Sequence, residues 1–144
     1  MFKLIKKSVS RFLQSGEKKS SKNSSRRASL GKSGEAFVAL ALQSRGYKIL
    51  DCNYRKRFGE IDIIAEKNEV ITFVEVKCRA KKYFHLSEVV NYSKQKKIIL
   101  TAKNYLSTNR VSDRALRFDV ALVEKYNDNY SLNYIKDAFT EKNE

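Results

Sequence analysis

Cysteine and histidine are scarce in this chain of 144 residues, which has two cysteines and one histidine. Cys52 and Cys78 are too few for a disulfide scaffold and lack the Cys-x-x-Cys spacing of many metal and redox motifs. Because His85 is the only histidine, a zinc site built from histidine and cysteine has too few ligands. We therefore expect a protein of a reducing compartment.

Long apolar runs are also missing. No stretch approaches the roughly 20 apolar residues of a transmembrane helix, and the first residues lack the apolar core and cleavage site of a secretory signal. The expected location is therefore the cytosol. With 42% hydrophobic and 32% charged residues, the chain has the composition of one globular domain with a charged surface.

Acidic residues are nearly absent from the first part of the chain. Residues 1–33 contain ten lysines and arginines but one acid, Glu17, and so carry nine of the fourteen net positive charges. Such a charge favours a polyanionic partner, either nucleic acid or an anionic membrane surface. We interpret residues 1–32 as a basic, flexible extension and residues 33–144 as the domain.

Helical spacing of apolar residues within residues 1–14 predicts a short amphipathic helix. It could lie on a membrane surface, fold on nucleic acid, act as an organellar transit peptide, or be a frayed basic extension. Residues 15–32 have little to bury and are expected to be a linker.

The remaining sequence alternates between helical and strand patterns. The predicted elements are a helix capped by Ser33 and stopped at Gly46, strands 47–54, 60–66 and 70–77, a helix capped by Ser93 with an apolar stripe from Ile98 to Leu106, and strands 116–124 and 130–136. This order predicts an α/β fold with a mixed central sheet flanked by helices.

Two of these apolar strands carry unexpected charges. A two-residue turn at Lys67-Asn68 would pair Asp62 with Phe73 and leave Asp62 and Glu75 as diagonal neighbours, about 7–8 Å apart. Glu60 and Lys77 would lie on the same face of the hairpin, because side chains alternate along a strand. An ordinary surface ladder of ion pairs is the alternative interpretation.

Converging carboxylates repel one another and favour a cation. Oxygen ligands suit Mg²⁺, for which Mn²⁺ can substitute, and such an ion can activate water and polarise a phosphate. Lys77 could neutralise the charge that develops. Glu35 shares a helix face with Val38 and Leu42 and should point toward the sheet, although a carboxylate in a first helical turn is also favourable by itself.

These residues resemble the PD-(D/E)xK, restriction-endonuclease-like superfamily, whose core has an αβββαβ order. Asp62 matches its aspartate, and Glu75-Val76-Lys77 matches its (D/E)xK element. The chain further resembles the YraN family of small bacterial proteins, which is similar to archaeal Holliday-junction resolvases. The matching segments are Gly31–Glu35, Gly46–Arg55, Gly59–Ala65, Phe73–Arg79, Ser93–Ile98, Arg117–Val120 and Ile135–Phe139.

The resemblance implies a Mg²⁺-dependent nuclease that hydrolyses phosphodiester bonds in DNA, with branched or junction DNA as the candidate substrate and a homodimer as the candidate assembly. It implies that the metal is held by Glu35, Asp62, Glu75 and the Val76 carbonyl, with Lys77 as catalytic lysine and Gln95 as a polar active-site residue. The chain departs from the family in its longer extension, residues 1–30, and in Tyr83-Phe84-His85, which replaces a glycine-containing turn.

Basic residues surround the predicted site in the sequence. Phosphate contacts are expected from Arg55, Lys56, Arg57, Arg79, Lys81, Lys82, Lys94, Lys96 and Lys97. The alternative for each is a solubilising rim. Because no base-reading element is apparent, recognition of DNA structure is expected over sequence. A non-catalytic nucleic-acid-binding module that keeps the nuclease fold is the alternative function.

Overall fold

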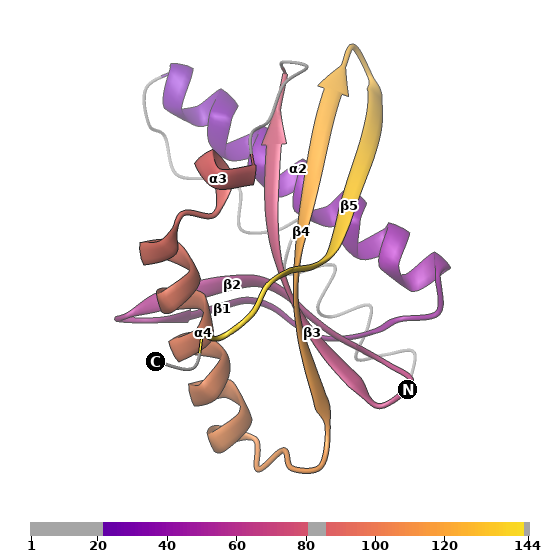
Figure 1. Cartoon of the computed structure of the whole chain (residues 1–144). Coiled ribbons are helices and arrows are strands. Elements are labelled where there is room, and N and C mark those ends of the chain that lie inside the picture. Colours follow the sequence, from indigo (N-terminus) through magenta and orange to yellow (C-terminus); the bar gives the residue numbers. More distant parts are fainter. Residues whose placement is uncertain (1–21, 81–85, 143–144) are drawn as a thin grey trace.

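Figure 1 shows the computed structural model, which describes residues 22–80 and 86–142. The predicted helix in residues 1–14, Lys81, Lys82 and the loop at 83–85 lie outside the described residues. The elements are α2 (Lys22–Ser44), β1 (Lys48–Lys56), β2 (Gly59–Lys67), β3 (Val70–Arg79), α3 (Leu86–Val89), α4 (Tyr92–Thr108), β4 (Ala115–Tyr126) and β5 (Asn129–Phe139). No helix among these residues is long and apolar enough to cross a membrane.

The strands form one mixed sheet in the order β1-β2-β3-β4-β5. Strands β3 and β4 are parallel, and the other neighbours are antiparallel. The parallel pair requires a crossover, which α3 and α4 provide. This arrangement confirms the predicted α/β class and is consistent with an αβββαβ core.

The two long helices pack on opposite faces of the sheet (Figure 1). On the α4 face, Ile98, Ala102 and Tyr105 are buried against the sheet, which confirms the predicted apolar stripe. On the α2 face, Val38, Ala39 and Leu42 pack against alternate residues of β3 and β4. The sheet is therefore covered on both sides, and polar groups between its strands are shielded from water.

The helix boundaries correct two predicted caps. Helix α2 begins at Lys22, so Ser33 lies inside it rather than at its start. The cap of α4 is Asn91, whose side-chain oxygen accepts from the Lys94 N–H at 2.9 Å, and Ser93 is already helical. Gly46 does end α2, with φ of +85°, as predicted. The division at residue 32/33 stays a prediction.

Candidate active site

The turn between β2 and β3 lies one residue later than predicted. Its central residues are Asn68 and Glu69, with φ of 50° and 62°, and Lys67 pairs with Val70. Positive φ values at both central residues are typical of a type I′ turn, whose twist matches that of the two strands in a tight hairpin. The predicted pairing of Asp62 with Phe73 is therefore wrong. Phe73 pairs with Ile64, and extending this register brings Asp62 opposite Glu75.

The regular pairing stops just before these two carboxylates. The last regular pair is Ile63 with Val74, and beyond it the Val76 N–H donates to Asp62 Oδ2 at 2.7 Å. A side chain thus takes the place of a backbone acceptor in the ladder. Strands β2 and β3 are held together at this point through the Asp62 carboxylate.

The alternation of faces along β2 is also interrupted here. Ile61 and Ile64 both pack on the α4 face although they are three residues apart, whereas strict alternation puts such residues on opposite faces. On β1, Asn53 lies between the partners of Ile61 and Ile63 and has φ of 53°. Strict alternation therefore does not hold along this part of β2, and the shared face of Glu60 and Asp62 stays a prediction.

Asp62 and Glu75 are buried, with 8% and 6% of their surface exposed. Burial raises the pKa of Asp62 well above its usual range, and the charges of Glu75 and Glu35 raise it further, against the effect of the Val76 N–H. Burial also raises the pKa of Glu75, while Lys94 and a hydrogen bond between the two carboxyl groups lower it. The two groups are one interacting pair.

Glu35 joins this pair from helix α2. Burial raises its pKa from 4.5 to about 7, the charges of Glu60 and Glu75 act in the same direction, and Arg55 and a hydrogen bond with Asn53 oppose them. This electrostatic contact agrees with the prediction that Glu35 points toward the sheet.

Gly34, the residue before Glu35, allows helix α2 to approach strand β3 closely. A Cβ added to Gly34 would lie 2.6 Å from the Cβ of Cys78, so α2 contacts β3 without a side chain between them.

The other predicted active-site residues take different positions. Lys94, predicted to bind phosphate, forms an ion pair with Glu75 Oε1. Lys77 is partly buried and follows Glu75 by two residues on β3. The amide nitrogen of Gln95 instead donates to the Val90 carbonyl at 3.0 Å, and its side chain lines a different groove.

The carboxylates are neighbours, but they do not converge on one point. Within the described residues, no group of three His, Cys, Asp or Glu side chains is placed to hold one ion. Lys94 occupies one side of Glu75, and Asn53 holds Glu35. The donor set nevertheless fits a hard divalent cation, because carboxylate and carbonyl oxygens are the ligands that such an ion prefers.

Most of the predicted phosphate-binding residues gather beside this pair. One hollow of about 350 Å³ is lined by Arg55, Lys56, Arg57, Phe58, Gly59, Glu60 and Lys97. A second of about 340 Å³ shares Gly59, Glu60 and Lys97 with it and adds Lys94. Arg79, at the end of β3, is not among the described residues that line either hollow.

Comparison with known proteins gives a consistent result. Residues 34–123 match the family described as uncharacterised protein family UPF0102. The chain belongs to the UPF0102 family. This family is the YraN family that the sequence motifs indicated, and its matched region includes every predicted metal-binding residue.

Similar UPF0102 proteins come from several bacteria. One from Alkaliphilus oremlandii is 47% identical over 113 residues, covering 76% of this chain and 97% of the relative. One from Clostridium tetani is 43% identical, covering 76% and 93%. One from Syntrophus aciditrophicus is 44% identical, covering 76% and 87%.

A second polar cluster of this UPF0102 fold escaped the sequence reasoning. Asp119 is fully buried, and both its oxygens accept from Arg117 at 2.8 Å. The Tyr134 hydroxyl and the Asp137 N–H also donate to it, at 2.6 Å and 2.9 Å. Asp137 has φ of 52° beside an irregularity in the β4–β5 register. This cluster fixes the irregular pairing of β4 with β5. Its only signal in the sequence is the alternation of charged residues within two apolar strands.

Proposed function

We propose that this chain is a metal-dependent nuclease that hydrolyses phosphodiester bonds in DNA, with branched or junction DNA as its preferred substrate. The observation that supports this most is the buried pair of Asp62 and Glu75. Two like charges out of water are costly unless protons or a cation compensate them. Lys94 compensates one of them, and a metal ion would replace the proton that the raised pKa of Asp62 favours on the other.

Asp62, Glu75 and Glu35 would hold Mg²⁺ or Mn²⁺, together with the Val76 carbonyl. The ion would supply a polarised phosphate and a water of lowered pKa. Lys77, on the same strand as Glu75, would neutralise charge on the phosphate oxygens. The adjoining basic hollows would hold the flanking phosphates, which fix the position of DNA without reading its sequence.

The test is cleavage of a panel of labelled DNA structures, comprising four-way junctions, flaps, forks, duplexes and single strands, with Mg²⁺ or Mn²⁺. We expect Asp62→Asn to lower the rate by at least about a hundredfold. Asp128→Asn, a change of an exposed carboxylate in the β4–β5 turn, is the matched control and should cleave normally. The proposal is rejected if no structure is cut, or if Asp62→Asn cuts as fast as the unchanged protein.

The ion pair of Lys94 with Glu75 favours a second candidate, a nucleic-acid-binding module without catalysis. A protein ammonium group would then replace the metal permanently. In that case DNA binding in EDTA would survive Glu75→Ala and Lys77→Ala. The affinity for DNA would fall sharply when the lysines and the arginine of residues 1–19 are changed to glutamine, because binding then depends on contacts between basic side chains and phosphates.

We also propose a cytosolic location and a homodimer. A four-way junction offers two symmetric cleavage points, which a twofold-symmetric dimer would match. Sedimentation of the protein alone and with a junction would give the stoichiometry.

A further inference from the structure

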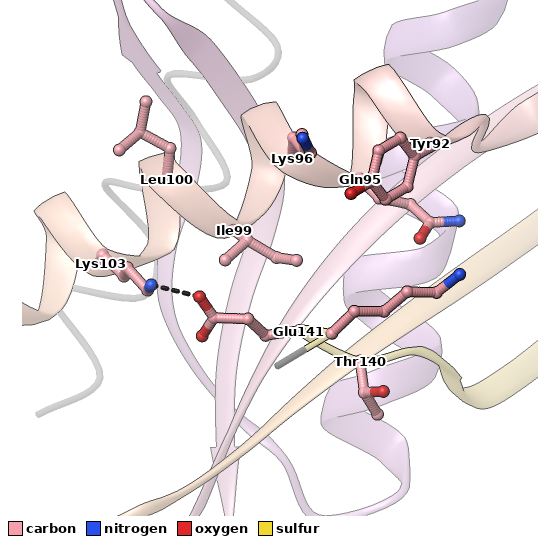
Figure 2. A pocket seen from close by; sticks show the side chains of 9 residues that line it. Tyr92, Gln95, Lys96, Ile99, Leu100, Lys103, Thr140 and Glu141 are labelled. Carbon is pink, nitrogen blue, oxygen red and sulfur yellow. Dashed lines mark hydrogen bonds and ion pairs between the residues drawn. The ribbon is translucent and has the colours of Figure 1, made fainter. Parts of the chain in front are cut away.

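Helix α4 has a second face, turned away from the carboxylates. Successive residues of an α-helix are about 100° apart, so Tyr92 and Lys96 project on the side opposite Lys94. The C-terminal segment 140–142 runs beside this second face, and Figure 2 shows the side chains between them. Together they line a groove of about 470 Å³.

The groove combines an aromatic ring with positive charge. Tyr92 is 48% exposed, and the Nζ atoms of Lys96 and Lys142 lie 4.6 Å and 5.7 Å from the centroid of its ring. Lys103 is the third lysine of the lining. Among the described lining residues one is acidic, Glu141, and it forms an ion pair with Lys103 (Figure 2).

We infer that this groove binds single-stranded DNA, with a nucleobase stacked on Tyr92 and the adjoining phosphates on Lys96, Lys142 and Lys103. An exposed contact between an ammonium group and a ring favours association about two- to fivefold. Stacking of a base on an aromatic ring contributes about five- to a hundredfold. A base therefore displaces the ammonium groups from the ring, and they move to the phosphates that accompany it.

Charge argues for this occupant over a protein partner. Three lysines against one glutamate give the lining a positive balance. Two copies of this lining repel each other, so the proposed homodimer would form through another surface. A single strand of DNA offers both negative phosphates and flat bases, and proteins that bind single strands combine these two features.

The inference rests on the proposed function for its role in the reaction. Helix α4, about 10–12 Å wide with its side chains, separates the groove from the carboxylates. At about 3.4 Å per stacked nucleotide, that width corresponds to three or four nucleotides. The groove would thus hold a single-stranded arm a few nucleotides from the bond that is cut, and so select forks and flaps over continuous duplex.

The test measures binding of a fluorescent eight-nucleotide thymidine oligomer in EDTA, with excess unlabelled duplex to occupy other basic surfaces. Tyr92→Ala should weaken binding about five- to a hundredfold, and Tyr92→Phe should bind normally because the ring remains. Tyr126→Ala is the matched control, because Tyr126 is 77% exposed at the far end of β4. Glu141→Gln releases Lys103 and should strengthen binding about two- to fivefold.

Equal affinities for the Tyr92→Ala and Tyr126→Ala variants would overturn the inference. A photoreactive 5-iodouracil oligomer gives a direct check, since it should cross-link to Tyr92; cross-links only to other residues would contradict the inference. Neither measurement requires cleavage. If no DNA is cut but these results hold, the groove stands and the nuclease proposal fails. If forks are cut while Tyr92→Ala binds normally, the nuclease proposal stands and the inference about the groove fails.

Discussion

Glu35 gives the sharpest test of the electrostatics at the candidate site. Its carboxyl group is partly buried and has a pKa raised from 4.5 to about 7, chiefly by burial and then by Glu60 and Glu75. In Glu35→Gln the side chain keeps its size and its ability to hydrogen-bond Asn53, but it cannot ionise. The comparison therefore isolates the cost of the charge.

The sign of the effect follows from linkage. A raised pKa means that the folded state holds the proton more tightly, so the stability that Glu35 contributes is complete below about pH 4.5 and is lost as the pH rises through 7. At full burial a shift of this size corresponds to about 3 kcal/mol. Because water reaches part of the side chain and screens its charge, we expect about 1–2 kcal/mol.

Urea unfolding of both proteins in EDTA measures this quantity. Glu35→Gln should be more stable by about 1–2 kcal/mol at pH 8.5 and equal to the unchanged protein at pH 4.5. Mg²⁺ at about one hundred times its dissociation constant should then raise the stability of the unchanged protein by about 2.7 kcal/mol and that of the variant by less. A variant that is less stable at pH 8.5 in EDTA would refute the reasoning.

Three further changes probe packing and charge, two beside the candidate site and one at the Asp119 cluster. Gly34→Ala should destabilise the fold by about 1–3 kcal/mol in thermal unfolding, because its Cβ would overlap a side chain of β3. Gly31→Ala is the control and should not destabilise the fold, because its Cβ would meet nothing within 4 Å. Asp119→Ala should cost about 3–5 kcal/mol in urea unfolding, because its arginine partner is left without a counter-charge; a loss under 1 kcal/mol would contradict this. Lys94→Met should tighten Mn²⁺ binding in calorimetry several-fold by removing a competing cation, and Lys97→Met, which changes a lysine of the same helix, should not.

The spacing of apolar residues predicted the helices and strands of the fold, because burial on the two faces of the sheet determines that spacing. The stripe of α4 repeats at helical spacing and meets the sheet as expected. Strands β2 and β3 carry apolar residues on both faces because helices cover both sides of the sheet. Such patterns depend on which residues are buried, and a single sequence records this well.

Local backbone conformation is what the sequence could not provide. Nothing in Asn68-Glu69 requires two positive φ values, and the preceding pair was an equally good two-residue turn. The sequence does not show that Asn53 adopts a φ of 53°. The break in the alternation of faces along β2, near Asp62, lies opposite this residue. Lys94 was predicted to contact phosphate because it opens the second helix, and only the packing of α4 brings it to Glu75.

The number of donors around each buried aspartate separates scaffold from site. A carboxylate has about four lone-pair positions, and Asp119 uses four, with two donors from Arg117 and one each from Tyr134 and Asp137. No position is left for a ligand, so its role is to fix β4 and β5.

Asp62 is comparably buried but receives a single N–H, from Val76, within the described part of the chain. Its pKa is raised by burial and then by the negative charges of Glu75 and Glu35. An aspartate with full hydrogen bonding stabilises a fold without further help, whereas one with spare acceptor positions beside two glutamates has room for the cation that we propose. This difference is why we assign the chemistry to Asp62 and the architecture to Asp119.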